Sequence, residues 1–288
     1  MALYTLHERP ESLVEPVLAV HLEGWIDAGS AGSGAMNALL NTLDPTPVAS
    51  FHVDYLLDQR ARRPIMKVVD GVNTGLSWPR IQLVAAKDRA GRDVLLLHGP
   101  EPDFQWRGFA RDVRSLCADL GVRMMVGLGA FPSPVPHTRP VPLVSTATTE
   151  ELARRIGFVP GSQEVSCGIH AVLERGFAGT GVPAVGIWAR VPHYAAPMPY
   201  PAASLALLQS LEDLGELEFD LSALSAAADE TRRRLDLLAG ANPQFGALLQ
   251  QLEAQADVAV EHQGSAFTDI PSGDEIAAEI ERFFTEQE

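Results

Sequence analysis

Short apolar segments, separated by stretches with helical periodicity, recur through the first two thirds of this chain. They are rich in valine, isoleucine and leucine, and several are apolar almost throughout instead of alternating with polar residues. Continuous apolar runs of this length are typical of strands that are buried on both faces of a sheet. The pattern predicts strands at 16–22, 48–53, 65–69, 81–86, 94–98, 124–128, 141–145 and 184–191.

Amphipathic helical patterns lie between these runs. The clearest covers 107–120, where Phe109 and Leu116 belong to one apolar stripe. Thr148 and Glu151 have the spacing of a capping box, which predicts the start of another helix. Strands that alternate with helices predict an α/β fold, here a three-layer sandwich with a largely parallel sheet.

The character of the sequence changes near Pro197, after which the strand signals stop. We therefore expect an α/β domain at 1–200 and a helical region at 201–288 that packs partly on it. Asn242-Pro243 separates two of the helical patterns, and proline is favoured at the first position of a helix, so the pair is predicted to form an antiparallel hairpin. The helical patterns cover 203–214, 221–239, 243–261 and 272–285.

Composition excludes several classes of protein. The formal net charge of −15 argues against a nucleic-acid binder, because such proteins usually present a basic face. The two cysteines, Cys117 and Cys167, lack the spacing of a disulfide framework or a cysteine zinc site. The chain has neither a signal-peptide pattern at its start nor an apolar run long enough for a membrane helix. We expect a cytoplasmic protein without metal or cofactor and without contact to a membrane.

Polar residues gather where the predicted strands end, which is the edge at which open α/β sheets bind ligands. After the first buried strand, the segment from Glu23 contains Asp27, Gly29 and Gly32 in a small-residue turn that leads into a helix. Free backbone N–H groups in such a turn bind anions. In the alternative interpretation, Asp27 caps the helix and the glycines let it approach the sheet closely.

Two further strand ends carry candidate residues. Glu101 alternates with prolines after the strand at 94–98, where it suits proton transfer, a ribose contact or an ion pair with a neighbouring arginine. His193 follows the strand at 184–191 in a Pro-His-Tyr sequence. A single histidine at such a position is more often structural than functional.

The run His137-Thr138-Arg139 is enclosed by prolines at 134, 136, 140 and 142. Proline fixes its own φ and pushes the preceding residue into an extended conformation, so the run is predicted to be extended, with His137 and Arg139 on one side and Thr138 on the other. A guanidinium beside an imidazole suits a small anionic ligand. Alternatively, Arg139 pairs with one of the many carboxylates of this chain.

Five segments, GWIDAGSAGSGA, HGPEPDFQW, GLGAFPSPVPHTRP, VPHY and the C-terminal PSGDEI, spread over most of the chain. Together they resemble the proteasome-assembly-chaperone-2 (PAC2) family, in its actinobacterial branch. The resemblance implies a sandwich akin to that of nucleoside phosphorylases and hydrolases, followed by helices. It also implies self-association into a homo-oligomer and, as a further partner, the proteasome or another protein assembly. Family members that dock on the proteasome often end in a hydrophobic-Tyr-any tail, whereas this chain ends Glu286-Gln287-Glu288, so docking would need another surface.

Three hypotheses follow from the sequence. The first, which we favour, is a non-enzymatic protein-binding or assembly factor, because the resemblance points to chaperones and neither a G-x-S-x-G nor an H-E-x-x-H motif is present. The second is an enzyme or sensor for a small anionic or ribose-containing ligand at the strand ends. The third is that the strand-end residues form only a structural polar network.

Overall fold

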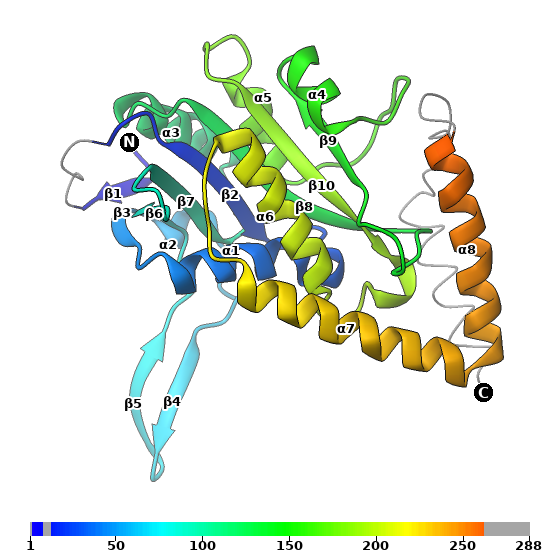
Figure 1. The fold of residues 1–288 in the computed structure, drawn as a ribbon. Helices are drawn as coiled ribbons and strands as arrows, with labels where there is room; N and C mark the ends of the chain where they lie inside the picture. The colour runs from blue at the N-terminus through cyan, green and yellow to red at the C-terminus, as the bar shows by residue number, and fades with distance from the viewer. Residues whose placement is uncertain (1, 8–12, 262–288) are drawn as a thin grey trace.

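The centre of the molecule is a mixed sheet of eight strands (Figure 1). The computed structural model describes residues 2–7 and 13–261, so the helix expected at 272–285 and the PSGDEI segment lie outside the described residues. The order across the sheet is β1-β3-β6-β7-β2-β8-β10-β9. The strands are β1 (Tyr4–Leu6), β2 (Val17–Glu23), β3 (Thr46–Phe51), β6 (Gln82–Lys87), β7 (Asp93–Pro100), β8 (Met124–Ser133), β9 (Leu143–Ala147) and β10 (Ala184–Pro192).

The four central strands, β7, β2, β8 and β10, run parallel, and the strands outside them pair antiparallel. Helices cover both faces of the sheet, which confirms the predicted three-layer α/β sandwich (Figure 1). Val17 and Ala19 of β2 point to the face covered by α1 and α6, whereas Leu18 and Val20 point to the face covered by α3 and α5. Burial on both faces is the reason for the continuous apolar run.

The helices predicted at 107–120, 203–214, 221–239 and 243–261 begin and end close to the predicted positions, whereas α2 was not predicted. The helices are α1 (Ala31–Thr42), α2 (Val53–Leu56), α3 (Trp106–Asp119), α4 (Glu150–Ile156), α5 (Ile169–Phe177), α6 (Pro201–Gly215), α7 (Ser222–Ala241) and α8 (Pro243–Glu261), with short 3-10 turns η1 (Ala28–Ser30) and η2 (His193–Ala195). The predicted cap of α4 was wrong by one residue, because Thr149 caps that helix through its hydroxyl. Thr148 instead pairs with Ala184 and prolongs the β9–β10 contact.

The predicted strand at 65–69 exists, but it lies outside the central sheet. As β4 (Ile65–Val69), it pairs only with β5 (Val72–Ser77), and the two strands form a hairpin that projects from the body (Figure 1). Every residue of both strands is exposed. The apolar run at 65–69 therefore does not contribute to the core.

The three C-terminal helices of the described part have different roles. Helix α6 completes one helical layer, and its Leu207, Leu208 and Leu211 are fully buried in the core. Helices α7 and α8 meet at Asn242, with Pro243 at the first helical position as predicted, and diverge from this corner (Figure 1). The antiparallel hairpin stays a prediction. None of the helices in the described residues has the length and apolar character needed to cross a membrane. The division of the chain into two domains at residue 200 stays a prediction.

Candidate functional site

The carboxyl ends of the four parallel strands lie at one edge of the sheet, as the sequence predicted. β2 ends at Glu23, β7 at Pro100, β8 at Ser133 and β10 at Pro192. All nine candidate residues lie at these ends or in the segments that follow them: Glu23, Asp27, Gly29, Gly32, Glu101, His137, Thr138, Arg139 and His193.

Asp27 caps the first turn of α1. Its Oδ1 accepts the N–H of Gly32 at 2.7 Å, and its Oδ2 accepts the N–H and the hydroxyl of Ser33 at 3.0 and 2.7 Å. His21 donates from Nδ1 to the Leu128 carbonyl, 2.9 Å away, since a carbonyl oxygen only accepts. Its Nε2 lies 3.1 Å from Ser33 Oγ and 3.6 Å from Asp27 Oδ2. Hydrogen bonds thus connect the side chains of His21, Ser33 and Asp27.

The two glycines of this turn serve close packing. Gly29 has a positive φ of 64°, and its N–H donates to the Ala196 carbonyl at 2.8 Å. A Cβ on Gly32 would lie 2.3 Å from the His21 ring and 2.9 Å from the Leu128 carbonyl. Because the N–H groups of both glycines already have acceptors within the protein, the turn favours the capping interpretation over an anion site.

Glu101 is a buried carboxylate between the ends of β2 and β7. Its side chain caps α5, because Oε1 accepts the N–H of Ile169 at 2.5 Å, and its own N–H donates to the Glu23 carbonyl at 2.6 Å. Burial raises the pKa of the Glu101 carboxyl, while the Ile169 N–H and the charge of Arg62 act in the opposite direction. The side chain of Glu23 is exposed. Glu101 therefore has a structural role at this edge.

His170, on the first turn of α5, is a residue that the sequence analysis missed. Its Nε2 accepts the N–H of Leu22 at 3.0 Å, and its ring lies 5.8 Å from that of His21 and 6.2 Å from that of Trp188. Burial, together with the nearby His21, lowers the pKa of His170 to about 3. The imidazole is therefore neutral at physiological pH, as an acceptor of a backbone N–H must be.

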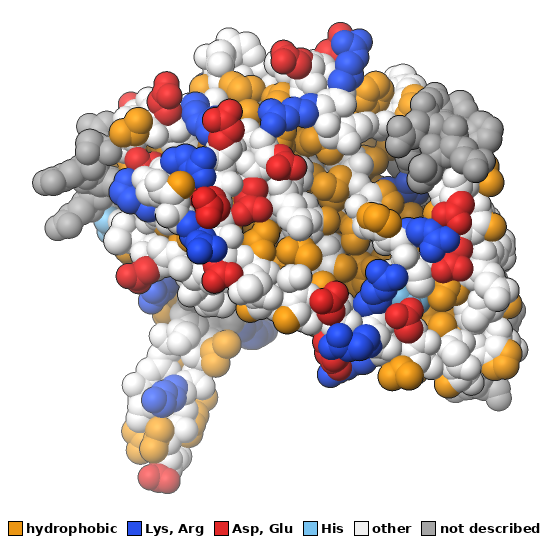
Figure 2. All heavy atoms as spheres, in the orientation of Figure 1, with side chains coloured by type: hydrophobic (Ala, Val, Ile, Leu, Met, Phe, Trp, Pro, Cys, Tyr) orange, Lys and Arg blue, Asp and Glu red, His pale blue; other side chains and the backbone are white. Residues whose placement is uncertain are grey.

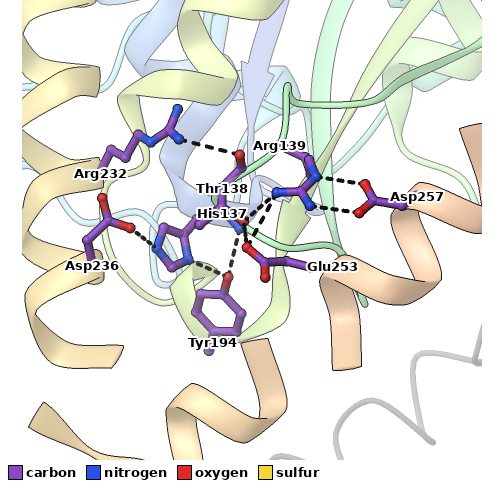
Figure 3. Close-up of polar contacts among 8 residues, drawn as sticks. All are labelled: His137, Thr138, Arg139, Tyr194, Arg232, Asp236, Glu253 and Asp257. Carbon is purple, nitrogen blue, oxygen red and sulfur yellow. Dashed lines mark hydrogen bonds and ion pairs between the residues drawn. The ribbon is translucent and has the colours of Figure 1, made fainter. Parts of the chain in front are cut away.

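The Pro-enclosed run forms a turn at His137 and Thr138, so the predicted extended conformation was wrong. The prolines at 136 and 140 restrict themselves and the residues before them, Val135 and Arg139, but leave His137 and Thr138 free to turn. The predicted sides are changed accordingly. His137 faces α7, whereas Thr138 and Arg139 both face α8 (Figure 3).

The His137 ring is fully buried and has a partner for each nitrogen (Figure 3). Its Nε2 donates to Asp236 of α7 at 3.2 Å, and its Nδ1 accepts from the Tyr194 hydroxyl at 2.8 Å. That hydroxyl in turn accepts the backbone N–H of His137 at 2.8 Å. Phe245 of α8 stacks on the imidazole with ring centres 6.2 Å apart. Burial lowers the pKa of the His137 imidazole, whereas the hydrogen bond and the charge of Asp236 raise it. Burial has the larger effect, so the pKa is lowered and the ring is neutral.

Thr138 and Arg139 bind two carboxylates that are one turn apart on α8 (Figure 3). The Arg139 guanidinium forms a two-point contact with Asp257, with both N–O distances 2.8 Å, and Thr138 donates to Glu253 at 2.5 Å. Arg139 also lies 3.4 Å from Glu253. The Arg139 guanidinium is therefore paired with carboxylates of the chain itself. This pairing is the alternative to an anion site that the sequence left open.

The nine candidates thus form two groups. Glu23, Asp27, Gly29, Gly32 and Glu101 lie around the starts of α1 and α5, whereas His137, Thr138 and Arg139 hold the α7–α8 corner. His193 belongs with the second group, since its ring lies edge-on to Tyr194 at 5.3 Å. His21 had a signal in the sequence, as the one charged or titratable residue inside the apolar run 17–22. No pattern in the sequence pointed to the three acidic partners on α7 and α8, which are Asp236, Glu253 and Asp257. Within the described residues, no group of three His, Cys, Asp or Glu side chains is arranged to hold a metal ion.

Comparisons with known proteins agree with this architecture. The chain is similar to a Mycobacterium tuberculosis protein of unknown function, Rv2714, with 36% identity and a TM-score of 0.84 over 90% of this chain and 92% of the other. A Corynebacterium glutamicum protein of unknown function is 31% identical, with a TM-score of 0.84 over 90% of this chain and 98% of that protein.

A third similar structure, Mycobacterium tuberculosis Rv2125, is described as a proteasome-assembly chaperone homologue. It is 33% identical, with a TM-score of 0.75 over 81% of this chain and 99% of its own. A comparison with curated proteins gives no match. The family model described as "PAC2 family" matches residues 21–239. With most of its length matched, the chain belongs to the PAC2 family.

Proposed function

We propose that this protein is a non-enzymatic protein-binding or assembly factor that works in the cytoplasm as a homo-oligomer. The observation that carries the proposal is the β4–β5 hairpin, which projects from the body and exposes its apolar side chains (Figures 1 and 2). Ile65 is 75% exposed, Val72 61% and Met66 54%. A two-stranded hairpin is marginally stable by itself in water, and an apolar surface of this kind usually marks a protein contact.

The charge of the hairpin favours a second copy of this chain as its partner. The hairpin and its stem, 63–80, carry three basic residues, Arg63, Lys67 and Arg80, against one acidic residue, Asp70, whereas the whole chain has a net charge of −15. An apolar arm with a basic balance is complementary to the acidic surface of another copy. Complementary charges of this kind also set the orientation of the contact.

The native mass tests self-association. Light scattering after size-exclusion chromatography should give a multiple of 31.0 kDa for the wild type and 31.0 kDa for the variants Ile65→Asp and Val72→Asp. Leu237→Asp is the matched control, because Leu237 of α7 is 74% exposed and lies outside the hairpin. A monomeric wild type, or equal dissociation in the Leu237 variant, would contradict the assignment of the contact to the hairpin.

The relatives support an assembly as the further partner. The mycobacterial relative at 33% identity is described as a proteasome-assembly chaperone homologue, which makes proteasome subunits the first partner to test. Affinity-tagged protein should recover these subunits, or the subunits of another assembly, from an extract of its own cells. Recovery of the tagged chain alone, at a salt concentration near the physiological value, would count against the assembly role.

A second candidate function, the binding of a small ligand at the carboxyl edge, is favoured by one observation. The side-chain amide of Gln59 is buried, and within the described residues it has no hydrogen-bond partner. Three residues later, the Arg62 guanidinium reaches Asp103 at 2.5 Å and lies beside Gly24, at the ends of β7 and β2. A ligand amide or hydroxyl would satisfy Gln59. Ribose and nucleosides should then raise the melting temperature of the wild type but not of Gln59→Leu.

A further inference from the structure

An open groove with a strongly basic lining lies between α3 and α5, on the face of the sheet opposite α1 and α6. Its volume is about 520 Å³, within the range of small-molecule sites. Ala110, Ala171 and Val172 supply apolar lining, and Cys167 lies two residues before the first residue of α5. Four arginines surround it: Arg107, Arg111, Arg114 and Arg175. Among the described residues that line the groove, none is acidic.

The sequence of α3 places three of these arginines on one helix face. Arg107, Arg111 and Arg114 are spaced by four and three residues, which brings their side chains to the same side of a helix. All four arginines are exposed. Arg111 pairs with its neighbour Asp112, and Arg114 donates to the Gly176 carbonyl at 3.4 Å. Neither Arg107 nor Arg175 has an ion pair with a carboxylate among the described residues.

This arrangement contrasts with that of Arg139. The guanidinium that the sequence singled out for an anion is held by Asp257 and Glu253, whereas Arg107 and Arg175 line the groove without an ion pair to a carboxylate among the described residues. Like charges that are collected in one place raise the local potential and concentrate an anion there. An unpaired guanidinium also presents two parallel N–H donors, which match the oxygens of a phosphate.

We propose that the α3–α5 groove binds a small molecule that carries a chain of phosphate groups, with the arginines on the phosphates and the apolar lining under the remainder of the ligand. The net charge of −15 favours a small anion over a nucleic acid or an anionic membrane. A long polyanion would lie against the acidic surface outside the groove, whereas a small one experiences mainly the charges within a Debye length of about 8 Å.

Cys167 provides a local reporter for this site. The chain has two cysteines, and Cys117 is buried, with a pKa raised by burial to about 12, so only the exposed Cys167 is accessible to reagents. The dianionic disulfide 5,5′-dithiobis(2-nitrobenzoate) should react with Cys167 faster, relative to neutral iodoacetamide, than it reacts with a thiol outside a basic groove. Bound pyrophosphate should remove this preference, because it neutralises the arginines.

The experiment combines calorimetric titration with the Cys167 labelling rate, using inorganic pyrophosphate as the probe and a buffer without phosphate. We expect saturable binding and a saturable fall in the rate with the dianionic reagent. Arg107→Gln and Arg175→Gln, made singly and together, should each weaken pyrophosphate binding by about tenfold or more, as the loss of a charge-assisted hydrogen bond predicts. The side chains are exposed, and a melting curve of each variant verifies that the fold is retained.

The matched control is Arg154→Gln with Arg233→Gln, which removes the same charge from exposed positions outside the groove. This pair should leave pyrophosphate binding within about twofold of the wild type. Equal weakening by both pairs would assign the effect to net charge and overturn the proposal. Absence of binding would overturn it, as would binding that survives loss of Arg107 and Arg175, or binding of an RNA oligomer without binding of pyrophosphate. Since none of these substitutions touches the hairpin, failure here leaves the assembly role standing.

Discussion

The neutral imidazole of His170 predicts a specific loss of stability in mild acid. Its pKa is lowered from 6.5 to about 3, chiefly because burial disfavours the charged ring. In the unfolded chain the imidazole takes up a proton below pH 6.5, whereas in the folded protein it stays neutral down to about pH 3. The neutral His170 therefore contributes its full stabilisation to the folded state above pH 6.5. This contribution to the free energy of unfolding is lost as the pH falls from 6.5 towards 3.

The size of the effect follows from the shift. Each unit of pKa difference corresponds to about 1.4 kcal/mol, so the whole shift amounts to about 5 kcal/mol, of which about 1 kcal/mol is lost between pH 7.5 and 5.5. This window lies above the pI of about 4.9, where the protein is least soluble. Burial also lowers the pKa of His98 and His137, so the wild type should lose more than His170 alone explains.

Urea denaturation at pH 7.5, 6.5 and 5.5 isolates His170 when the wild type is compared with His170→Gln. Glutamine keeps an acceptor for the Leu22 N–H but does not titrate, and the contributions of the other histidines cancel in the difference. The variant should lose about 1 kcal/mol less than the wild type between pH 7.5 and 5.5. His7→Gln, at an exposed position, should retain the wild-type pH dependence. Identical pH dependence in His170→Gln and the wild type would refute the reasoning.

Three further predictions concern packing and the α7–α8 corner. Gly32→Ala should reduce the free energy of unfolding by about 1–3 kcal/mol in urea denaturation, because its Cβ would meet His21 and the Leu128 carbonyl, whereas Gly240→Ala, with open space around it in α7, should stabilise slightly. Tyr194→Phe should cost about 1–3 kcal/mol in the same assay, since the His137 N–H loses its acceptor; an unchanged midpoint would contradict this hydrogen-bond assignment. Arg139→Gln should speed amide hydrogen exchange in α8, because the ion pair between Arg139 and Asp257 holds α8 to the segment after β8. The exchange rates in β2 should stay unchanged.

The fold could be predicted from the sequence to the extent that burial determines residue type. The central strands are buried on both faces and therefore apolar almost throughout, as in 17–22, and their positions were predicted correctly. The same signal was misleading at 65–69, because an apolar strand on a projecting arm has the composition of a core strand. The strands at 4–6 and 72–77 were missed, since the first is short and the second is largely polar.

The sequence was sufficient to predict where the candidate residues lie in the fold, but not which residues they contact. Parallel topology alone brings the strand ends to one edge, so Asp27, Glu101 and His137 were located there correctly. Whether an arginine is free depends on what lies opposite it, and Asp257, which binds Arg139, is 118 residues further along the chain. No local pattern connects these two residues. The same holds for Arg107 and Arg175 of the α3–α5 groove, because the absence of an ion pair there among the described residues follows from helix packing and not from a motif.

Hydrogen exchange in the hairpin 65–77 tests the proposed role most directly, because an isolated two-stranded hairpin is marginal in water and its amides exchange quickly unless a partner covers them. If the hairpin binds a second copy of the chain, its amides should exchange slowly at tens of micromolar protein and progressively faster as the protein is diluted, while the amides of β2 stay protected throughout. Fast exchange of the hairpin at every concentration would contradict a homo-oligomer built on this arm.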